Sequence, residues 1–200
     1  LKEYTNRMSM RGIAKVEGKP LTTIYSFIRR KGVEAYAYLL LLQERLESFT
    51  AKATVIDESW TYVWARHGQK RGDLWIWNAL ADGVPFFITG DRGYMTFSFL
   101  KNSLPESRVY YTDGYSVYQV LDKHVVGKEY TYTVESYHSY CRAHLARLAR
   151  DTRAVNRDMA IVEYSLALLN VMDPVVYSRE KTPLNEAYLK GIHYIRSKLI

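Results

Sequence analysis

The chain has 200 residues, of which 48% are hydrophobic, and this is enough for one main domain with a smaller appendage. A single cysteine, Cys141, excludes a disulfide framework and a cysteine-based zinc site. The longest apolar run, residues 35–42, is too short for a membrane span of about 20 residues. The sequence also contains no Gly-rich phosphate loop of the kind that nucleotide hydrolases use. We therefore expect a cytoplasmic protein with no membrane partner and no ATP requirement.

The formal charge of +7 is concentrated toward the two ends of the chain. Residues 1–50 carry 9 Lys or Arg against 5 Asp or Glu, residues 51–135 carry 9 against 10, and residues 136–200 carry 10 against 6. The three segments therefore have net charges of +4, −1 and +4. Basic ends around a slightly acidic centre suit a protein that holds a polyanion with its flanks and cations at its centre. A generic basic surface is the alternative interpretation.

Residues 10–32, MRGIAKVEGKPLTTIYSFIRRKG, predict two short helices separated by a break at residues 18–20. The first helix carries apolar residues at positions 13, 14 and 16, and the second carries them at positions 21, 24, 25 and 28. A small residue at position 14, a glycine four residues later and an isoleucine six residues beyond it are spaced as in a helix-turn-helix. Residues 33–49 predict a further, strongly apolar helix for packing or dimerisation.

In a helix-turn-helix, the second helix enters the major groove of DNA. Its N-terminal polar residues, Thr22, Thr23 and Ser26, would then contact base edges, and Arg29 and Arg30 near its end would contact phosphates. The alternative interpretation is an ordinary helical hairpin whose basic residues form a solvated face. Agreement between the spacing, the turn glycine and the basic end favours DNA binding.

From residue 54 the pattern changes to strands. Runs of β-branched and aromatic residues at 54–65, 73–81 and 84–90 are separated by turn sequences and predict three consecutive antiparallel strands. A helix, a fourth strand, a short helix, a fifth strand and a long helix are then predicted at 95–104, 108–113, 115–122, 124–127 and 133–150. This order predicts an α/β fold, an RNase-H-like mixed five-stranded sheet with flanking helices, preceded by an all-α helix-turn-helix segment.

The predicted elements divide the chain into three segments. Residues 1–50 would form the helix-turn-helix segment with its connecting helix, residues 51–155 the RNase-H-like core, and residues 156–200 a helical C-terminal extension. In the long helix after the fifth strand, the leucines are expected to face inward and the arginines to take polar positions: Leu145, Leu148, Arg142, Arg147 and Arg150.

Three acidic residues occupy related places in this order. Asp57 lies within the first strand, Asp113 ends the fourth strand, and Glu135 lies in the first turn of the long helix. The first and fourth strands are neighbours at the centre of such a sheet, so we expect the three carboxylates to converge. Such carboxylates would repel one another, and bound divalent cations best explain their proximity. Oxygen ligands favour Mg²⁺ or Mn²⁺ over zinc, and two such ions can catalyse phosphoryl displacement.

Asp113 is followed by Gly114, and this pair has a simpler interpretation as a turn. Aspartate accepts local backbone hydrogen bonds, and glycine tolerates positive φ. If Asp113 is instead a metal ligand, Gly114 is expected to leave room beside it.

Four segments resemble the insertion-sequence-one family of DDE transposases: VIDESWTYVW, YYTDGYSVY, HVVGKEYTYTVES and RAHLARLARDT. The resemblance covers roughly residues 54–153 and implies a DNA transposase that cuts at the ends of its own mobile element and joins them to target DNA. By motif position, it implies that Asp57, Asp113 and Glu135 are the catalytic triad and that Arg142 lies near the DNA. We expect element ends and target DNA as partners, a homo-oligomer on DNA and an association with the nucleoid.

Two other functions stay open at this point. One is an RNase-H-like nuclease or resolvase that only hydrolyses DNA, and the other is a catalytically inactive DNA-binding remnant of a mobile element.

Among single residues, Glu58 points to the opposite face of the strand from Asp57, so we expect it to face solvent or to support the site. His138 makes half of a di-iron motif with Glu135, but only one copy is present, so we expect it to contact phosphate or to pack. We expect structural roles for the remaining candidates, His124, His144 and Cys141.

Overall fold

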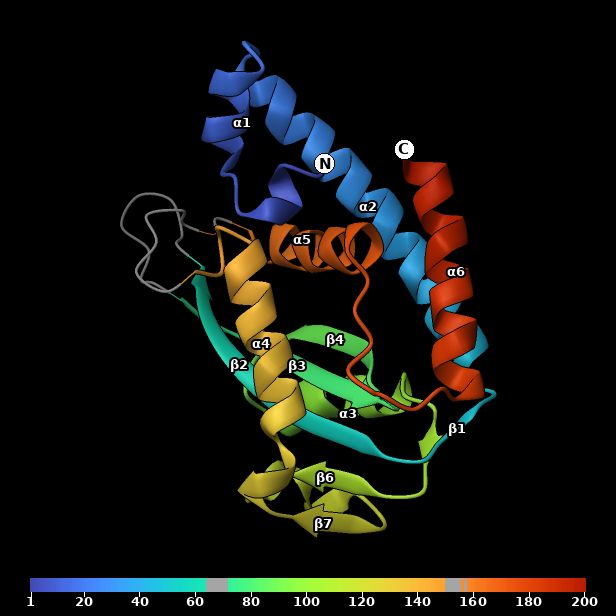
Figure 1. Ribbon diagram of the computed structural model, residues 1–200. Helices are drawn as coiled ribbons and strands as arrows, with labels where there is room; N and C mark the ends of the chain where they lie inside the picture. Colours follow the sequence, from blue (N-terminus) through green and yellow to red (C-terminus); the bar gives the residue numbers. More distant parts are fainter. Residues whose placement is uncertain (64–71, 150–155, 157) are drawn as a thin grey trace.

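The computed structural model describes residues 1–63, 72–149, 156 and 158–200 (Figure 1). The predicted end of the first strand beyond Val63 and the predicted helical position Arg150 lie outside these residues. One mixed sheet forms the centre of the molecule, and helices cover both of its faces. None of the helices in the described part of the chain combines the length and apolar character needed to cross a membrane.

The central sheet has the strand order β4-β3-β2-β6-β7. The strands are β2 (Thr54–Val63), β3 (Gly72–Ala81), β4 (Val84–Gly90), β6 (Tyr110–Thr112) and β7 (His124–Val126). The first three form an antiparallel meander, whereas β6 pairs in parallel with both β2 and β7. The predicted fold class, an RNase-H-like mixed sheet of five strands with flanking helices, is therefore confirmed.

The hairpin between β3 and β4 shows how local sequence chemistry sets this meander. Asp82 and Gly83 both have positive φ, 47° and 80°, as the favoured two-residue hairpin turns require. At Gly83 a side chain would also collide with the backbone of Tyr177 and Ser178, because an added Cβ would lie 2.5–2.6 Å from it. Glycine at this position therefore serves both the turn and the close packing of the segment that follows α5.

Helices on the two faces explain why β3 is almost entirely buried. α3 (Tyr94–Asn102) covers one face, where Phe97 packs against Trp77. α4 (Tyr132–His144) and α5 (Met159–Met172) cover the other face, where Asn78 contacts α4 and Thr89 contacts α5. Strands that are covered on both sides are apolar along their whole length, in contrast to half-exposed strands that alternate.

The N-terminal segment contains a short 3₁₀ helix and two α-helices: η1 (Tyr4–Asn6), α1 (Met10–Val16) and α2 (Leu21–Leu46). The predicted break is present, and Gly18 has a φ of 61°. The second helix of the helix-turn-helix and the apolar helix after it form one continuous helix of 26 residues. The DNA-binding candidates Thr22, Thr23, Ser26, Arg29 and Arg30 are all exposed.

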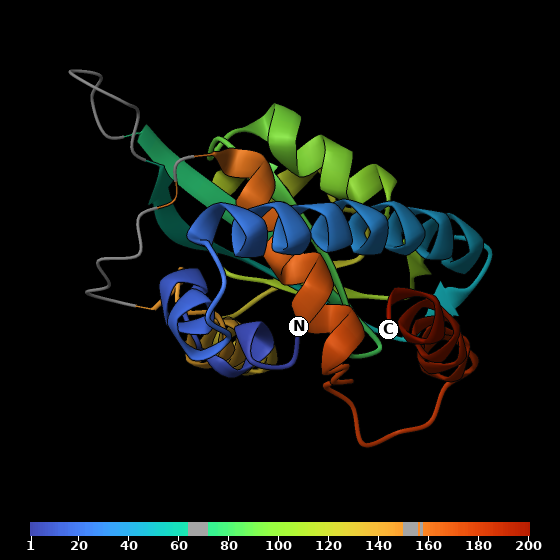
Figure 2. The same ribbon diagram turned by 90° about the horizontal axis from the view of Figure 1, so that it is seen from above.

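The long helix α2 joins the N-terminal segment to the rest of the molecule. Its buried residues repeat with helical spacing and pack on α5 and on α6 (Pro183–Leu199). Figure 2 shows α2 crossing over α5. At Gly32 the helices approach so closely that an added Cβ would lie 2.5 Å from the Cβ of Tyr164. Val16 on α1 and Leu21 and Tyr25 on α2 belong to the predicted apolar positions but are exposed. On α2, only one stripe of residues packs against the neighbouring helices.

The predicted helix over residues 133–150 is wrong at its C-terminal end. α4 ends at His144, and Leu145 has extended backbone and is buried. Arg147 therefore lies beyond the helix, where its Nε donates to Tyr4 Oη at 2.7 Å and its Nη1 to Asn156 Oδ1 at 3.0 Å. These tertiary contacts hold the segment after α4 against η1 and, through Asn156, against β2. Helical periodicity in the sequence does not predict them.

Smaller differences concern short elements. The predicted helix at 115–122 is a 3₁₀ helix, η2 (Ser116–Val120), and another, η3 (Lys128–Tyr130), precedes α4. A two-stranded parallel pair, β1 (Thr50–Ala51) with β5 (Glu106–Ser107), was not predicted. Two-residue strands carry too little hydrophobic pattern to be recognised from sequence.

Candidate active site

Asp57 lies on β2 and faces α4. Its neighbour across the ladder on β3 is Asn78, and its side chain is 19% exposed. Burial raises the pKa of Asp57 from its ordinary value of 3.8 to about 7, with further contributions from the charges of Glu58, Asp113 and Glu135. Burial is the largest cause of this shift, and the charges of Asp113 and Glu135 contribute less than that of Glu58.

Asp113 follows the last residue of β6. Its Oδ1 accepts a hydrogen bond from the backbone N–H of Tyr115 at 2.9 Å, which is the local turn that aspartate is known to form. The turn does not depend on the special backbone freedom of glycine, because Gly114 is not among the residues with positive φ. An added Cβ at Gly114 would come no closer than 4.0 Å to Val126, so the space beside Asp113 is open.

Glu135 lies in the first turn of α4, where its Oε1 accepts a hydrogen bond from Thr131 Oγ1 at 3.1 Å. Among the residues that the structure describes, no three His, Cys, Asp or Glu side chains are close enough together to hold a metal ion. The oxygen atoms of Asp57, Asp113 and Glu135 nevertheless fit Mg²⁺ or Mn²⁺ by their chemistry. Their assignment as catalytic metal ligands stays a prediction.

His138 lies on α4 between Asp57 and Asn78. Asn78 Nδ2 donates to His138 Nε2 at 2.9 Å and to the carbonyl of Ile76 at 3.1 Å, so Nδ1 carries the ring proton. Nδ1 lies 3.8 Å from Asp57 Oδ2, a distance at which a protonated ring would form an ion pair. Burial and the charge of Arg142 lower the pKa of His138 to about 3, so the ring is neutral and the contact is only polar.

Asn78 is a site residue that the sequence analysis missed. It is 1% exposed, and its Oδ1 accepts no hydrogen bond from the residues that the structure describes. One signal was available, because Asn78 is the polar exception in the buried apolar run of β3. Arg142, a predicted DNA contact, lies on the same helix as His138 and lines a small cavity with His138 and Asn78.

Glu58 points to the other face of the sheet, as predicted, but it does not face solvent. Its side chain is 2% exposed, and both of its oxygens accept hydrogen bonds. Arg92 donates to Oε1 from Nε at 2.8 Å and from Nη2 at 2.6 Å, and Tyr118 Oη donates to Oε2 at 2.5 Å. Burial and the charge of Glu58 raise the pKa of Tyr118, so the phenol stays protonated and continues to donate. Arg92 and Tyr118 were also missed, because nothing in the sequence pairs them with Glu58.

The other predicted candidates have structural roles. His124 Nε2 lies 2.5 Å from Thr112 Oγ1, across the β6–β7 pair. His144 Nδ1 bonds the carbonyl of Tyr140 at 2.9 Å near the C-terminal end of α4. Burial raises the pKa of Cys141 to about 12, so this buried thiol is inert.

An RNase-H-like sheet with acidic residues at its centre defines a class of enzymes that act on nucleic acids, and comparison with known proteins narrows the class. Residues 52–166 match the family model for the IS1 transposase, which covers more than half of the chain. The chain therefore belongs to the IS1 transposase family, and the resemblance predicted from its sequence motifs is confirmed.

Two relatives show how far this similarity extends. The chain is 31% identical over 111 residues to the insertion element IS1 4 protein InsB of Escherichia coli K12, which covers 53% of this chain and 66% of the relative. It is 30% identical over 111 residues to the IS1 protein InsB of Shigella sonnei, covering 53% of this chain and 84% of that protein. A solved structure, the Mos1 transposase paired-end complex with the left transposon end, aligns with 95% of this chain and 71% of its own at 13% identity and a TM-score of 0.33.

Proposed function

We propose that this protein is a metal-dependent DNA transposase that cuts at the ends of an insertion element and joins them to target DNA. Asp57, Asp113 and Glu135 would hold Mg²⁺ or Mn²⁺. The observation that carries this proposal is the position of Asp57 on β2 beside β6, the strand that leads into Asp113, in a chain of the IS1 transposase family. Burial and acidic neighbours also raise the pKa of Asp57, and a bound cation would favour the ionised form of this carboxylate.

When bound, the ions would supply positive charge for the attacking and leaving oxygens of a phosphodiester. The chain's own residues orient the ligands. The Asx turn at Tyr115 holds one oxygen of Asp113, and Thr131 holds one oxygen of Glu135. The neutral ring of His138 covers Asp57 without offsetting its charge. Water would attack first, and the freed 3′-hydroxyl would then attack target DNA, with no covalent link between protein and DNA.

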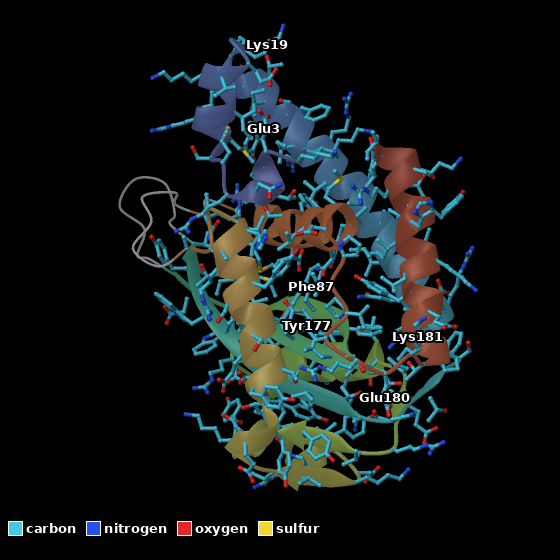
Figure 3. All side chains as sticks on the ribbon, in the orientation of Figure 1. Glu3, Lys19, Phe87, Tyr177, Glu180 and Lys181 are labelled. Atoms are coloured by element: carbon cyan, nitrogen blue, oxygen red, sulfur yellow. The ribbon has the colours of Figure 1, made fainter. Side chains whose placement is uncertain are left out.

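DNA would be held by α1 and the beginning of α2, with the helix-turn-helix on element ends. Thr22, Thr23 and Ser26 would contact bases, and Arg29 and Arg30 would contact phosphates. All five are exposed, and α1 and the first turns of α2 extend away from the sheet (Figure 1). Lys19 lies at the tip of this segment (Figure 3). Arg142 would contact DNA next to the carboxylates, and the enzyme would act in the cytoplasm, as a homo-oligomer on nucleoid DNA.

The catalytic assignment is tested with Asp113→Asn. The variant keeps the side-chain shape but removes a charged ligand, so cleavage and strand transfer in Mg²⁺ should fall by orders of magnitude while DNA affinity is retained. Asp122→Asn is a matched control, because Asp122 is exposed in the turn before β7. Wild-type strand transfer by Asp113→Asn would contradict the assignment.

The same assay separates the alternatives. A nuclease or resolvase would nick element ends in Mg²⁺ but would not join a pre-cut 3′-hydroxyl end to target DNA. A catalytically inactive remnant would bind element ends without either reaction.

DNA binding is tested by changing Arg29 and Arg30 together to alanine. Loss of two phosphate contacts should weaken binding to every duplex and flatten the plot of log affinity against log salt by roughly one unit per contact. Changing Thr22 or Ser26 should instead narrow the difference between element-end and random DNA at nearly constant slope. Alanine at Lys190 and Lys198, two exposed lysines on α6, is the control for loss of charge alone. If the double arginine variant keeps the wild-type slope of log affinity against log salt, residues 10–32 are a structural hairpin and not a DNA-binding element.

A further inference from the structure

The sheet itself does not determine how far Asp113 lies from Asp57. β6 has only three residues, and it pairs with β2 only at Thr54–Tyr110 and Val55–Tyr111. In this register Asp57 and Asp113 would be opposite each other, but each lies two residues beyond the last pair. The strand carrying Asp113 is therefore held to β2 by backbone hydrogen bonds only upstream of the site, and other contacts must set the separation of the two carboxylates.

Those contacts lie on the opposite face of the sheet and start at Glu58, the residue next to Asp57. Glu58 is almost fully buried, and Arg92 and Tyr118 occupy its two oxygens. Tyr118 belongs to η2, which follows directly on the turn at Asp113. One end of the Asp113 segment is thus bonded to the residue beside Asp57.

Arg92 makes a second connection to the same segment. Its guanidinium carbon lies 4.5 Å from the ring centroid of Trp75 and 4.4 Å from that of Tyr115. Tyr115 Oη donates to the carbonyl of Arg92 at 2.7 Å, and the backbone N–H of Tyr115 donates to Asp113 Oδ1 at 2.9 Å. A chain of contacts therefore runs from Glu58 through Arg92 and Tyr115 to the carboxylate of Asp113.

We propose that Glu58 and Arg92 are positioning residues that set the spacing between Asp57 and Asp113 and thereby the affinity of the site for divalent cations. The inference rests on the proposed function. A carboxylate bonded through both oxygens to a planar guanidinium and a buried phenol has little freedom to move. Its neighbour in sequence, Asp57, therefore keeps a constant relation to the segment that carries Asp113. Groups that orient metal ligands in this way typically contribute 10–100-fold to metal affinity or activity.

The test uses Glu58→Gln and Arg92→Lys in the full chain. Glutamine keeps the volume of Glu58 but loses its charge, and lysine cannot donate from two nitrogens of one rigid plane. We expect calorimetry to show Mn²⁺ binding weakened by roughly 10–100-fold. Strand transfer should then require correspondingly more Mg²⁺ and recover at saturating metal. The amide of Tyr115 should exchange with solvent faster, because its acceptor on Asp113 is less well placed.

The matched control is the exposed pair between Lys52 and Glu180, whose charged atoms lie 2.8 Å apart. Figure 3 labels Glu180, whose side chain is 68% exposed. Glu180→Gln removes an ion pair of similar length that makes no contact with the Asp113 segment, so its Mn²⁺ affinity and Tyr115 exchange should equal those of the wild type. Tyr115→Phe is the variant to use if Glu58→Gln does not fold, because it removes only the hydroxyl bond to Arg92. It should weaken Mn²⁺ binding by a few-fold.

The outcomes are distinct. Wild-type Mn²⁺ affinity and wild-type Tyr115 exchange in Arg92→Lys and Tyr115→Phe would overturn the positioning role while leaving the transposase proposal intact. A wild-type protein that neither binds Mn²⁺ nor transfers strands would instead overturn the proposed function, together with the inference that rests on it. Loss of activity that persists at saturating metal, with unchanged Mn²⁺ affinity, would also contradict the inference.

Discussion

Asp57 and Glu58 are consecutive carboxylates on one strand, and they face opposite sides of the sheet, where their bonding partners differ. On the α3 face, Glu58 is buried with a guanidinium and a phenol that occupy both of its oxygens. On the α4 face, Asp57 meets a neutral imidazole at 3.8 Å and the charges of other carboxylates. A buried carboxylate whose oxygens are both bonded is held within the fold, whereas one without such partners is a candidate ligand for a cation, as proposed for Asp57.

The largest expected effect follows from removing the uncompensated charge. Asp57→Asn should lower Mg²⁺-dependent cleavage and strand transfer by about a thousandfold or more, because a site with one charged ligand fewer holds cations poorly. Gel assays with labelled element ends measure both reactions, and filter binding confirms that DNA is still bound. If Asp57→Asn transfers strands at the wild-type rate, Asp57 is not a metal ligand, and the difference between Asp57 and Glu58 has no bearing on catalysis.

Removing the compensated charge should affect stability instead. Glu58→Ala leaves Tyr118 without an acceptor and separates Arg92 from its partner, so the free energy of unfolding should fall by roughly 3 kcal/mol. Urea titration followed by tryptophan fluorescence measures this change. Glu180→Ala, in the exposed pair with Lys52, should leave the free energy of unfolding at the wild-type value. Equal stability of Glu58→Ala and the wild type would show that the contacts of Glu58 contribute little.

The pH dependence of stability should distinguish the two carboxylates. Without metal, the pKa of Asp57 is about 7 in the folded chain against 3.8 ordinarily, so between these values the folded state holds a proton that the unfolded state has lost. Stability attributable to Asp57 is therefore complete below about pH 4 and is lost as the pH rises to about 7, by roughly 2–3 kcal/mol after allowance for residual solvation. Urea titrations in EDTA at pH 4.5 and 7.5 should show this loss in the wild type and a smaller one in Asp57→Asn. An identical loss in both proteins would assign the effect to other groups.

The smallest expected effect concerns His138. Because its pKa is lowered to about 3, the ring is neutral near pH 7 and gives Asp57 no positive charge. His138→Asn should therefore move the pKa of Asp57 by less than about half a unit in carboxyl-detected NMR titrations. A rise of one unit or more would mean that the wild-type ring is protonated and that Asp57 is compensated after all.

Parts of this arrangement were predictable from the chain alone. Alternating and apolar runs predicted the five main strands, the Asp82-Gly83 hairpin was evident from its turn residues, and the strand order placed Asp57 on a strand beside that of Asp113. Periodicity also identified the exposed polar face at the start of α2. These features depend on residues close in sequence, whose spacing directly reflects the geometry of a strand, a turn or a helix.

The remaining features depend on contacts between residues far apart in sequence. The sequence alone determined that Asp57 and Glu58 face opposite sides of a strand, because successive side chains alternate. Only the tertiary structure decided which of them is compensated, because Arg92 and Tyr118 lie 34 and 60 residues from Glu58 and meet it through the packing of the α3 face. The same holds for Asn78, which is 60 residues from the His138 ring that it bonds, and for the end of α4, where Arg147 contacts Tyr4 143 residues away. Hydrogen bonds of this kind leave no periodic trace in a sequence, because each one depends on two surfaces that meet only when the chain has folded.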